Sequence, residues 1–143
     1  MQPPLSVGTM IRGQYVVEEV LDKGGSGTVY LVREGQNKHL FVLKQIAQSA
    51  SKDPYQFAFE SMAFKRLAHP ALPYIYDMFD DPNYNRTFML MEYIEGQNLD
   101  KVREEMPQKH FSLAQVLTFM APIADAIIYL HNQHPPIIHQ DIK

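Results

Sequence analysis

Apolar and β-branched residues mark three short segments in the first third of the chain. They are residues 15–21, 28–32 and 39–46, each bounded by glycine or polar turn residues. Short β-branched, apolar runs between turn residues are typical of strands, and the short connections predict antiparallel hairpins. Two further strands are predicted at 74–79 and 86–93, because an Asp-Asp-Pro-Asn turn separates them.

Helical signals follow and separate these strands. One helix is predicted to begin at Asp53, which can cap it, with proline at the first helical position, and to run to about Ala68. A short helix is predicted near 99–105. A long helix begins after Ser112, which forms a capping box with Gln115 ahead of apolar residues at helical spacing. The pattern predicts an α+β fold, with a five-stranded antiparallel sheet and one helix, followed by a helical part.

Composition narrows the class of protein. The 143 residues are 45% hydrophobic and 20% charged, which is a globular balance. Cysteine is absent, so disulfides and thiolate metal sites are excluded, and a reducing, cytoplasmic location is expected. A net charge of −3 does not favour nucleic acid or an anionic membrane as partner. Because no uninterrupted apolar run reaches about 18 residues and no signal peptide is recognised, no membrane segment is expected.

A glycine cluster between two predicted strands is the first candidate for chemistry. Gly24-x-x-Gly27-x-Val29 lies in a hairpin, where glycine would let backbone amides approach a phosphate. Most glycine-rich hairpins are only turns. A dinucleotide-binding motif is disfavoured, since that motif needs a helix after the loop and here a strand follows.

Charged residues supply the other candidates. Lys44 ends an apolar strand, Glu60 lies in the first predicted helix, and Asp141 and Lys143 follow a short apolar stretch. Each residue alone would most simply be a solvated surface charge. Together, and in this order, they match the glycine loop, strand lysine, helix glutamate and catalytic loop of one known signature set.

On these motifs the chain resembles the protein kinase family, in its bacterial-type serine/threonine branch. The resemblance is carried by residues 24–32, 60–73, 89–96 and 137–143. It implies a protein-kinase-like fold made of an N-terminal lead-in at 1–10, an N-lobe at 11–92, a hinge at 93–97 and the start of a helical C-lobe at 98–143. It also implies phosphoryl transfer from ATP to protein hydroxyl groups.

The resemblance assigns roles to single residues. Lys44 would contact the α- and β-phosphates and pair with Glu60, Asp141 would orient the substrate hydroxyl, and Lys143 would neutralise the transferring phosphoryl group. Met91 would stand at the back of the pocket. The implied ATP-binding residues are Leu21, Gly24, Gly25, Ser26, Gly27, Val29, Val42, Lys44, Met91, Glu92 and Ile94.

Departures from the family pattern affect what is expected. Asp22 stands where the first loop glycine is usual, Val42 replaces a common alanine, and Gln140 replaces the usual arginine of the catalytic loop. Without that arginine, no arginine-dependent activation-loop phosphate switch is expected.

The Mg²⁺ ligands of the complete kinase are expected beyond residue 143, so the isolated chain is expected to transfer no phosphate. The alternative is a truncated or pseudokinase-like module that binds nucleotide or a partner without catalysis. The protein substrate is not readable from this sequence.

Overall fold

The computed structural model describes residues 3–24, 27–35, 37–46 and 61–138. Its named elements are β1 (Met10–Ile11), β2 (Tyr15–Gly24), β3 (Gly27–Glu34), β4 (Leu40–Ile46), β5 (Ile75–Asp81), β6 (Arg86–Glu92), α2 (Leu99–Glu105) and α3 (Leu113–His131). Residues 61–65 are also helical, whereas the predicted start of that helix at Asp53 lies outside the described residues. The chain forms two compact units: Met1–Ala68 with Pro73–Tyr93, and His69–Leu72 with Ile94–Lys143.

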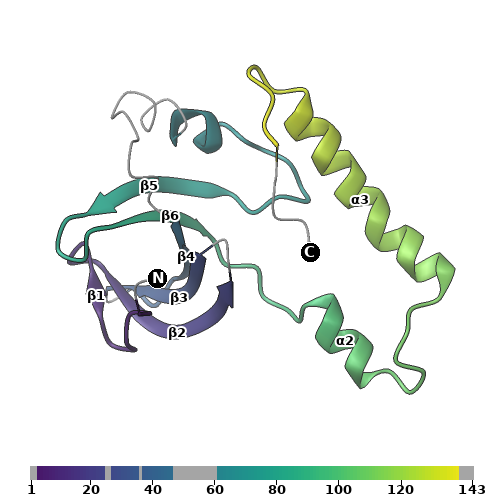
Figure 1. The fold of residues 1–143 in the computed structure, drawn as a ribbon, viewed down its shortest axis with the longest axis horizontal. Helices are drawn as coiled ribbons and strands as arrows, with labels where there is room; N and C mark the ends of the chain where they lie inside the picture. The colour runs from purple at the N-terminus through teal and green to yellow at the C-terminus, as the bar shows by residue number, and fades with distance from the viewer. Residues whose placement is uncertain (1–2, 25–26, 36, 47–60, 139–143) are drawn as a thin grey trace. The chain divides into compact units, whose positions relative to one another are not determined.

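The strands of the first unit form one antiparallel sheet in the order β1-β2-β3-β4-β6-β5 (Figure 1). All five predicted strands are confirmed, but the count of five is wrong, because the described residues form a sheet of six strands. The additional strand β1 pairs Met10 with Val16 and Ile11 with Tyr15. Two residues are too few to show an alternating pattern, and the chain reverses through Arg12 and Gly13, whose φ angles are 54° and 66°.

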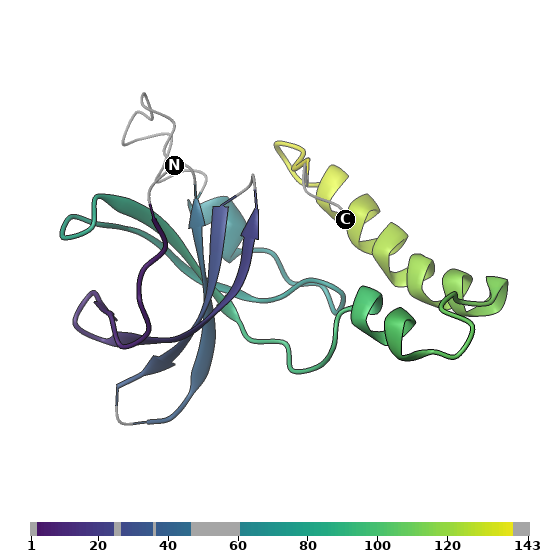
Figure 2. The same cartoon turned by 60° about the horizontal axis from the view of Figure 1, so that its bottom comes forward.

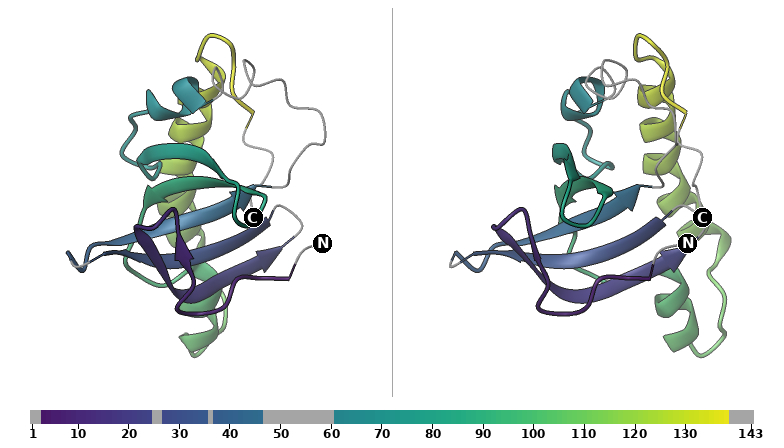
Figure 3. Two further views of the ribbon diagram at one scale, coloured as in Figure 1. Left: turned by 90° about the vertical axis from the view of Figure 1, so that its left-hand side faces the viewer. Right: turned by 60° about the vertical axis from the view of Figure 1, so that its left-hand side comes forward.

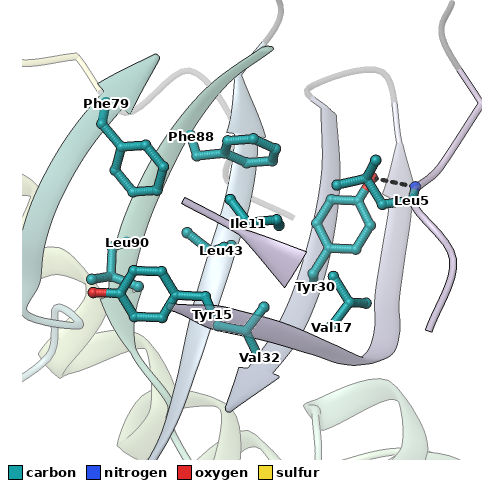
Figure 4. Packing of buried hydrophobic residues seen from close by; sticks show 10 residues of the cluster. All are labelled: Leu5, Ile11, Tyr15, Val17, Tyr30, Val32, Leu43, Phe79, Phe88 and Leu90. Atoms are coloured by element: carbon teal, nitrogen blue, oxygen red, sulfur yellow. Dashed lines mark hydrogen bonds between the residues drawn. The ribbon is translucent and has the colours of Figure 1, made fainter. Parts of the chain in front are cut away.

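The sheet is strongly curled (Figures 2 and 3), and its core side chains gather within the curl (Figure 4). Figure 4 shows the side chains that meet there, which come from every strand of the sheet and from the segment before β1. The core cluster consists of Leu5, Ile11, Tyr15, Val17, Tyr30, Val32, Leu43, Phe79, Phe88 and Leu90. Because strand residues alternate between faces, the intervening positions project to the other face of the sheet.

The segment before β1 belongs to this core. Leu5 is buried, and its backbone N–H donates to the hydroxyl of Tyr30 at 3.1 Å (Figure 4). Arg86 Nη2 donates to the carbonyl oxygen of Pro3 at 2.6 Å, and the N–H of Gly8 donates to the carbonyl of Val17 at 2.8 Å. The sequence predicted only a lead-in here, because two prolines and polar neighbours carry no periodic signal.

Asp77 on β5 joins parts of the first unit that are distant in sequence. Its carboxylate accepts from Arg12 Nη1 at 2.9 Å and contacts Lys65 Nζ at 2.5 Å. Burial by itself would raise the pKa of the Asp77 carboxyl, but the hydrogen bonds from Lys65 and Arg12 and the charge of Lys65 outweigh it. The pKa of Asp77 therefore lies below its ordinary value.

This depressed pKa predicts a pH-dependent contribution of Asp77 to folding. The ionised carboxylate should stabilise the fold above its unfolded-state pKa of about 3.9, and this contribution should disappear as the pH falls through the lower folded-state pKa. We expect Asp77→Asn to lower the chemical denaturation midpoint at neutral pH, and the difference from wild type to shrink on acidification. Asp100→Asn, at an exposed ion pair with Arg103 in α2, serves as control. A difference that is independent of pH would contradict the assignment.

The second unit contains α2 and α3. The predicted capping box of α3 is confirmed: the Ser112 hydroxyl accepts from the Gln115 N–H, and the Gln115 side chain accepts from the Ser112 N–H. The α3 side chains Ala126 and Leu130 are buried, whereas several of its apolar side chains are exposed, namely Leu113, Val116, Leu117, Met120 and Ile128.

Helix α3 is also long and apolar enough to cross a membrane, judged by length and composition alone. Core helices of soluble proteins have the same length and composition, so this property assigns no membrane segment. The expectation that residues 1–143 contain no membrane segment stays a prediction.

Candidate functional site

Strand register brings four of the implied ATP-binding residues to one face of the sheet. Val29 pairs with Lys44, and Val42 pairs with Met91. Directly paired residues of antiparallel strands project to the same face, and Val42 and Lys44 are two residues apart on β4, so they also share a face. Val29, Val42, Lys44 and Met91 therefore lie together on the face opposite the core, which we call the Lys44 face.

Lys44 lies on β4 within an apolar setting. The neighbouring Leu43 is completely buried in the core, Val42 is buried on the Lys44 face, and Lys44 itself is half-buried. The combination of apolar side chains and a half-buried cation suits a ligand that has both a flat apolar part and anionic groups.

Two residues that the sequence reasoning did not single out share this face. Leu31 pairs with Val42, and Met89 pairs with Lys44. The period-two alternation of β3 and β6 could have identified them, since they lie two residues from Val29 and Met91 respectively. They extend the apolar surface around the lysine.

The hairpin formed by β2 and β3 has a pair of glycines as its last cross-strand pair. Gly24 pairs with Gly27, and the residues between them, Gly25 and Ser26, lie outside the described residues. Gly27 has a φ of 128°, and a Cβ atom at this position would overlap the backbone carbonyl of Gln45. Glycine is thus required here by the close approach of β3 to β4 as well as by any role in covering a phosphate.

Glu92, the last residue of β6, is one of the implied ATP-binding residues, and its backbone is already partly hydrogen-bonded. The N–H of Glu92 donates to the carbonyl of Tyr74 at 2.8 Å, and the Glu92 carboxylate accepts from the N–H of Tyr74 at 3.1 Å. The Glu92 N–H is therefore engaged within the first unit, so its part in holding an adenine would fall to its carbonyl oxygen. Ile94 belongs to the second unit and has an exposed side chain.

Several implied site residues lie outside the described residues, and their assignments stay predictions. They are Gly25, Ser26, Glu60, Asp141 and Lys143. Within the described part of the chain, no group of three or more His, Asp or Glu side chains is arranged to hold a metal ion.

Similar sequences are found among protein kinases. Residues 15–143 match the protein kinase domain family. The probable serine/threonine-protein kinase YbdM of Bacillus subtilis is 30% identical over 143 residues, which cover 98% of this chain and 54% of YbdM. Serine/threonine-protein kinase Aurora-1 of Arabidopsis thaliana is 33% identical over 126 residues, covering 86% of this chain and 41% of that protein.

Solved structures with a similar fold include kinase domains. The crystal structure of the PknI kinase domain of Mycobacterium tuberculosis superposes with a TM-score of 0.73 at 22% sequence identity, covering 98% of this chain and 56% of that domain. The chain thus spans about half the length of YbdM and of the PknI kinase domain.

Proposed function

Because this chain belongs to the protein kinase domain family, we propose that it is the nucleotide-binding part of a serine/threonine protein kinase. The observation that carries the proposal is the placement of Lys44 on one sheet face with Val29, Val42 and Met91. An adenine ring suits the apolar side chains, and the ammonium group suits phosphates. The names of similar proteins such as YbdM and Aurora-1 support the choice of serine and threonine hydroxyls.

Positioning and charge neutralisation are the main demands of phosphoryl transfer. We assign phosphate binding to Lys44, oriented by Glu60, and coverage of the phosphates to the hairpin that contains Gly24 and Gly27. Asp141 would orient the acceptor hydroxyl, and Lys143 would balance charge on the transferring group. These last two assignments, and that of Glu60, rest on the resemblance.

Magnesium is proposed only for the complete kinase. The resemblance places the Mg²⁺ ligands beyond residue 143, so no step is assigned to Mg²⁺ in residues 1–143. We also propose a cytoplasmic location, because ATP is the expected phosphate donor. The protein substrate is left open, since it is recognised by parts of a kinase that lie outside the Lys44 face.

The proposal is tested by incubating the complete gene product with labelled ATP, Mg²⁺ and a generic protein acceptor, followed by phosphoamino-acid analysis. We expect label on serine or threonine, and none when the metal is chelated. The isolated 143-residue chain is expected to transfer none. Binding of ATP without transfer by the complete product would favour the alternative of a non-catalytic, pseudokinase-like module. Absence of both binding and transfer would refute the proposal.

A further inference from the structure

A β-bulge in β2 brings two consecutive residues opposite one residue of β3. Val20 pairs with Tyr30 and Asp22 pairs with Val29, so β2 advances by two residues where β3 advances by one. In a β-bulge, two residues of one strand oppose a single residue of its partner. Leu21 and Asp22 both lie opposite Val29 for this reason, at the edge of the Lys44 face.

Asp22 and Lys44 belong to the same cross-strand row. Asp22 pairs with Val29, which in turn pairs with Lys44, so the three residues project to one face of the sheet. Adjacent strands are about 4.8 Å apart, which separates the backbones of Asp22 and Lys44 by about 10 Å. Asp22 is exposed and Lys44 is half-buried.

This separation is short enough for the two charges to act on one ligand. The separation slightly exceeds the screening length of about 8 Å at physiological salt, so salt attenuates the interaction without abolishing it, and charges near a protein surface interact more strongly than in bulk water. An anionic group held by Lys44 therefore lies within the field of the Asp22 carboxylate. A family member with glycine at this position would lack that negative charge.

We infer that Asp22 is a specificity-determining residue that weakens nucleotide binding according to the negative charge of the phosphate groups. The inference rests on the proposed nucleotide binding at the Lys44 face. ATP carries one more negative charge than ADP, and adenosine carries none, so the repulsion acts most on ATP and leaves adenosine unaffected. A divalent cation that accompanies the phosphates reduces their charge, so metal-free ATP is penalised more than ATP with Mg²⁺.

The test is Asp22→Asn, which removes the charge and keeps nearly the same shape. With the complete gene product, titration calorimetry should show a dissociation constant for metal-free ATP about fivefold lower than in wild type. The decrease should be smaller for ADP, absent for adenosine, and reduced by added salt because salt screens the repulsion.

Two variants separate charge from shape. Asp22→Glu keeps the negative charge and should retain the wild-type order of affinities. Glu34→Gln removes an acid at the other end of the β2–β3 hairpin, where Glu34 pairs with Tyr15, and should leave all three dissociation constants unchanged.

The possible results are distinguishable. Equal changes for ATP and adenosine in Asp22→Asn would show that Asp22 acts through the shape of the bulge and would overturn the inference. Unchanged ATP affinity in a protein that binds ATP would overturn it as well, while leaving the proposed function intact. If wild type binds none of the three ligands, the proposed nucleotide binding fails and the inference fails with it.

Discussion

Replacement of Lys44 by methionine is expected to reduce phosphoryl transfer by the complete gene product about 10²–10³-fold, the usual cost of losing one preorganised charge or donor at a reacting centre. Methionine retains an unbranched apolar stem, which suits a position paired with Val29 and Met89. The ammonium group that the register places on this face together with Val29, Val42 and Met91 is lost. The variant should therefore lose phosphoryl transfer and keep the folding stability of the wild type.

The measurement is the rate of label transfer from ATP at saturating acceptor, with thermal unfolding of the same preparations. Lys101→Met, at an exposed position of α2, is the matched control and should keep wild-type activity. Lys44→Met with a wild-type melting curve and wild-type transfer would contradict the role assigned to Lys44. A lower melting temperature together with lost transfer would instead indicate that Lys44 supports the fold.

Replacement of Arg86 by alanine is expected to lower the free energy of unfolding by about 3 kcal/mol, because it removes a buried group with several hydrogen bonds and takes one donor from each of their acceptors. Arg86 is 7% exposed. Its Nη1 donates to the Gln45 side-chain oxygen at 2.9 Å and to the Tyr30 hydroxyl at 3.3 Å, and its Nη2 donates to the Pro3 carbonyl at 2.6 Å. The guanidinium thus joins β3, β4, β6 and the N-terminal segment.

Arg33→Ala is the matched control for Arg86→Ala. Arg33 lies on β3 and binds Glu18 at 2.7 Å and the Gly35 carbonyl at 2.7 Å, but its side chain is 36% exposed. Exposed ion pairs contribute about 0–1 kcal/mol, so Arg33→Ala should have a small effect on the urea denaturation midpoint. Equal effects of the two variants would contradict the role assigned to burial of Arg86.

A double-mutant cycle tests the link to the N-terminal segment. Deletion of residues 1–5 removes the Pro3 carbonyl and the buried Leu5 side chain. If Arg86 acts partly through Pro3, the deletion and Arg86→Ala should together cost less than the sum of their separate effects. Strict additivity would show that the Pro3 contact contributes nothing to stability.

Local pattern was sufficient to predict most elements of the fold. Apolar and β-branched runs between turn residues identified all five longer strands, and the Ser112–Gln115 capping box marked the first turn of α3. These signals are local, because such runs, turns and caps depend on neighbours within a few residues. For the same reason β1 was missed, since two residues carry no period, and the burial of Leu5 was missed, since its partner Tyr30 is 25 residues away.

The candidate site was likewise predictable from local sequence only in part. The sequence motifs identified Lys44, the glycines and the apolar positions as a set through their order along the chain. The sequence could not show that the Glu92 N–H is already bonded to Tyr74, because that contact joins separate strands. It also did not identify Leu31 and Met89 as neighbours of the site.

By itself the sequence determined the elements, the motif order and the protein kinase resemblance, all of which depend on residue types at short range or at fixed spacing. Only the tertiary structure decided which residues share a face, because strand register and the bulge at Leu21 set that relation. It therefore decided the row from Asp22 to Lys44, the need for glycine at position 27 beside Gln45, and the burial of Arg86. These depend on contacts between distant segments, and such contacts exist only once the sheet has formed.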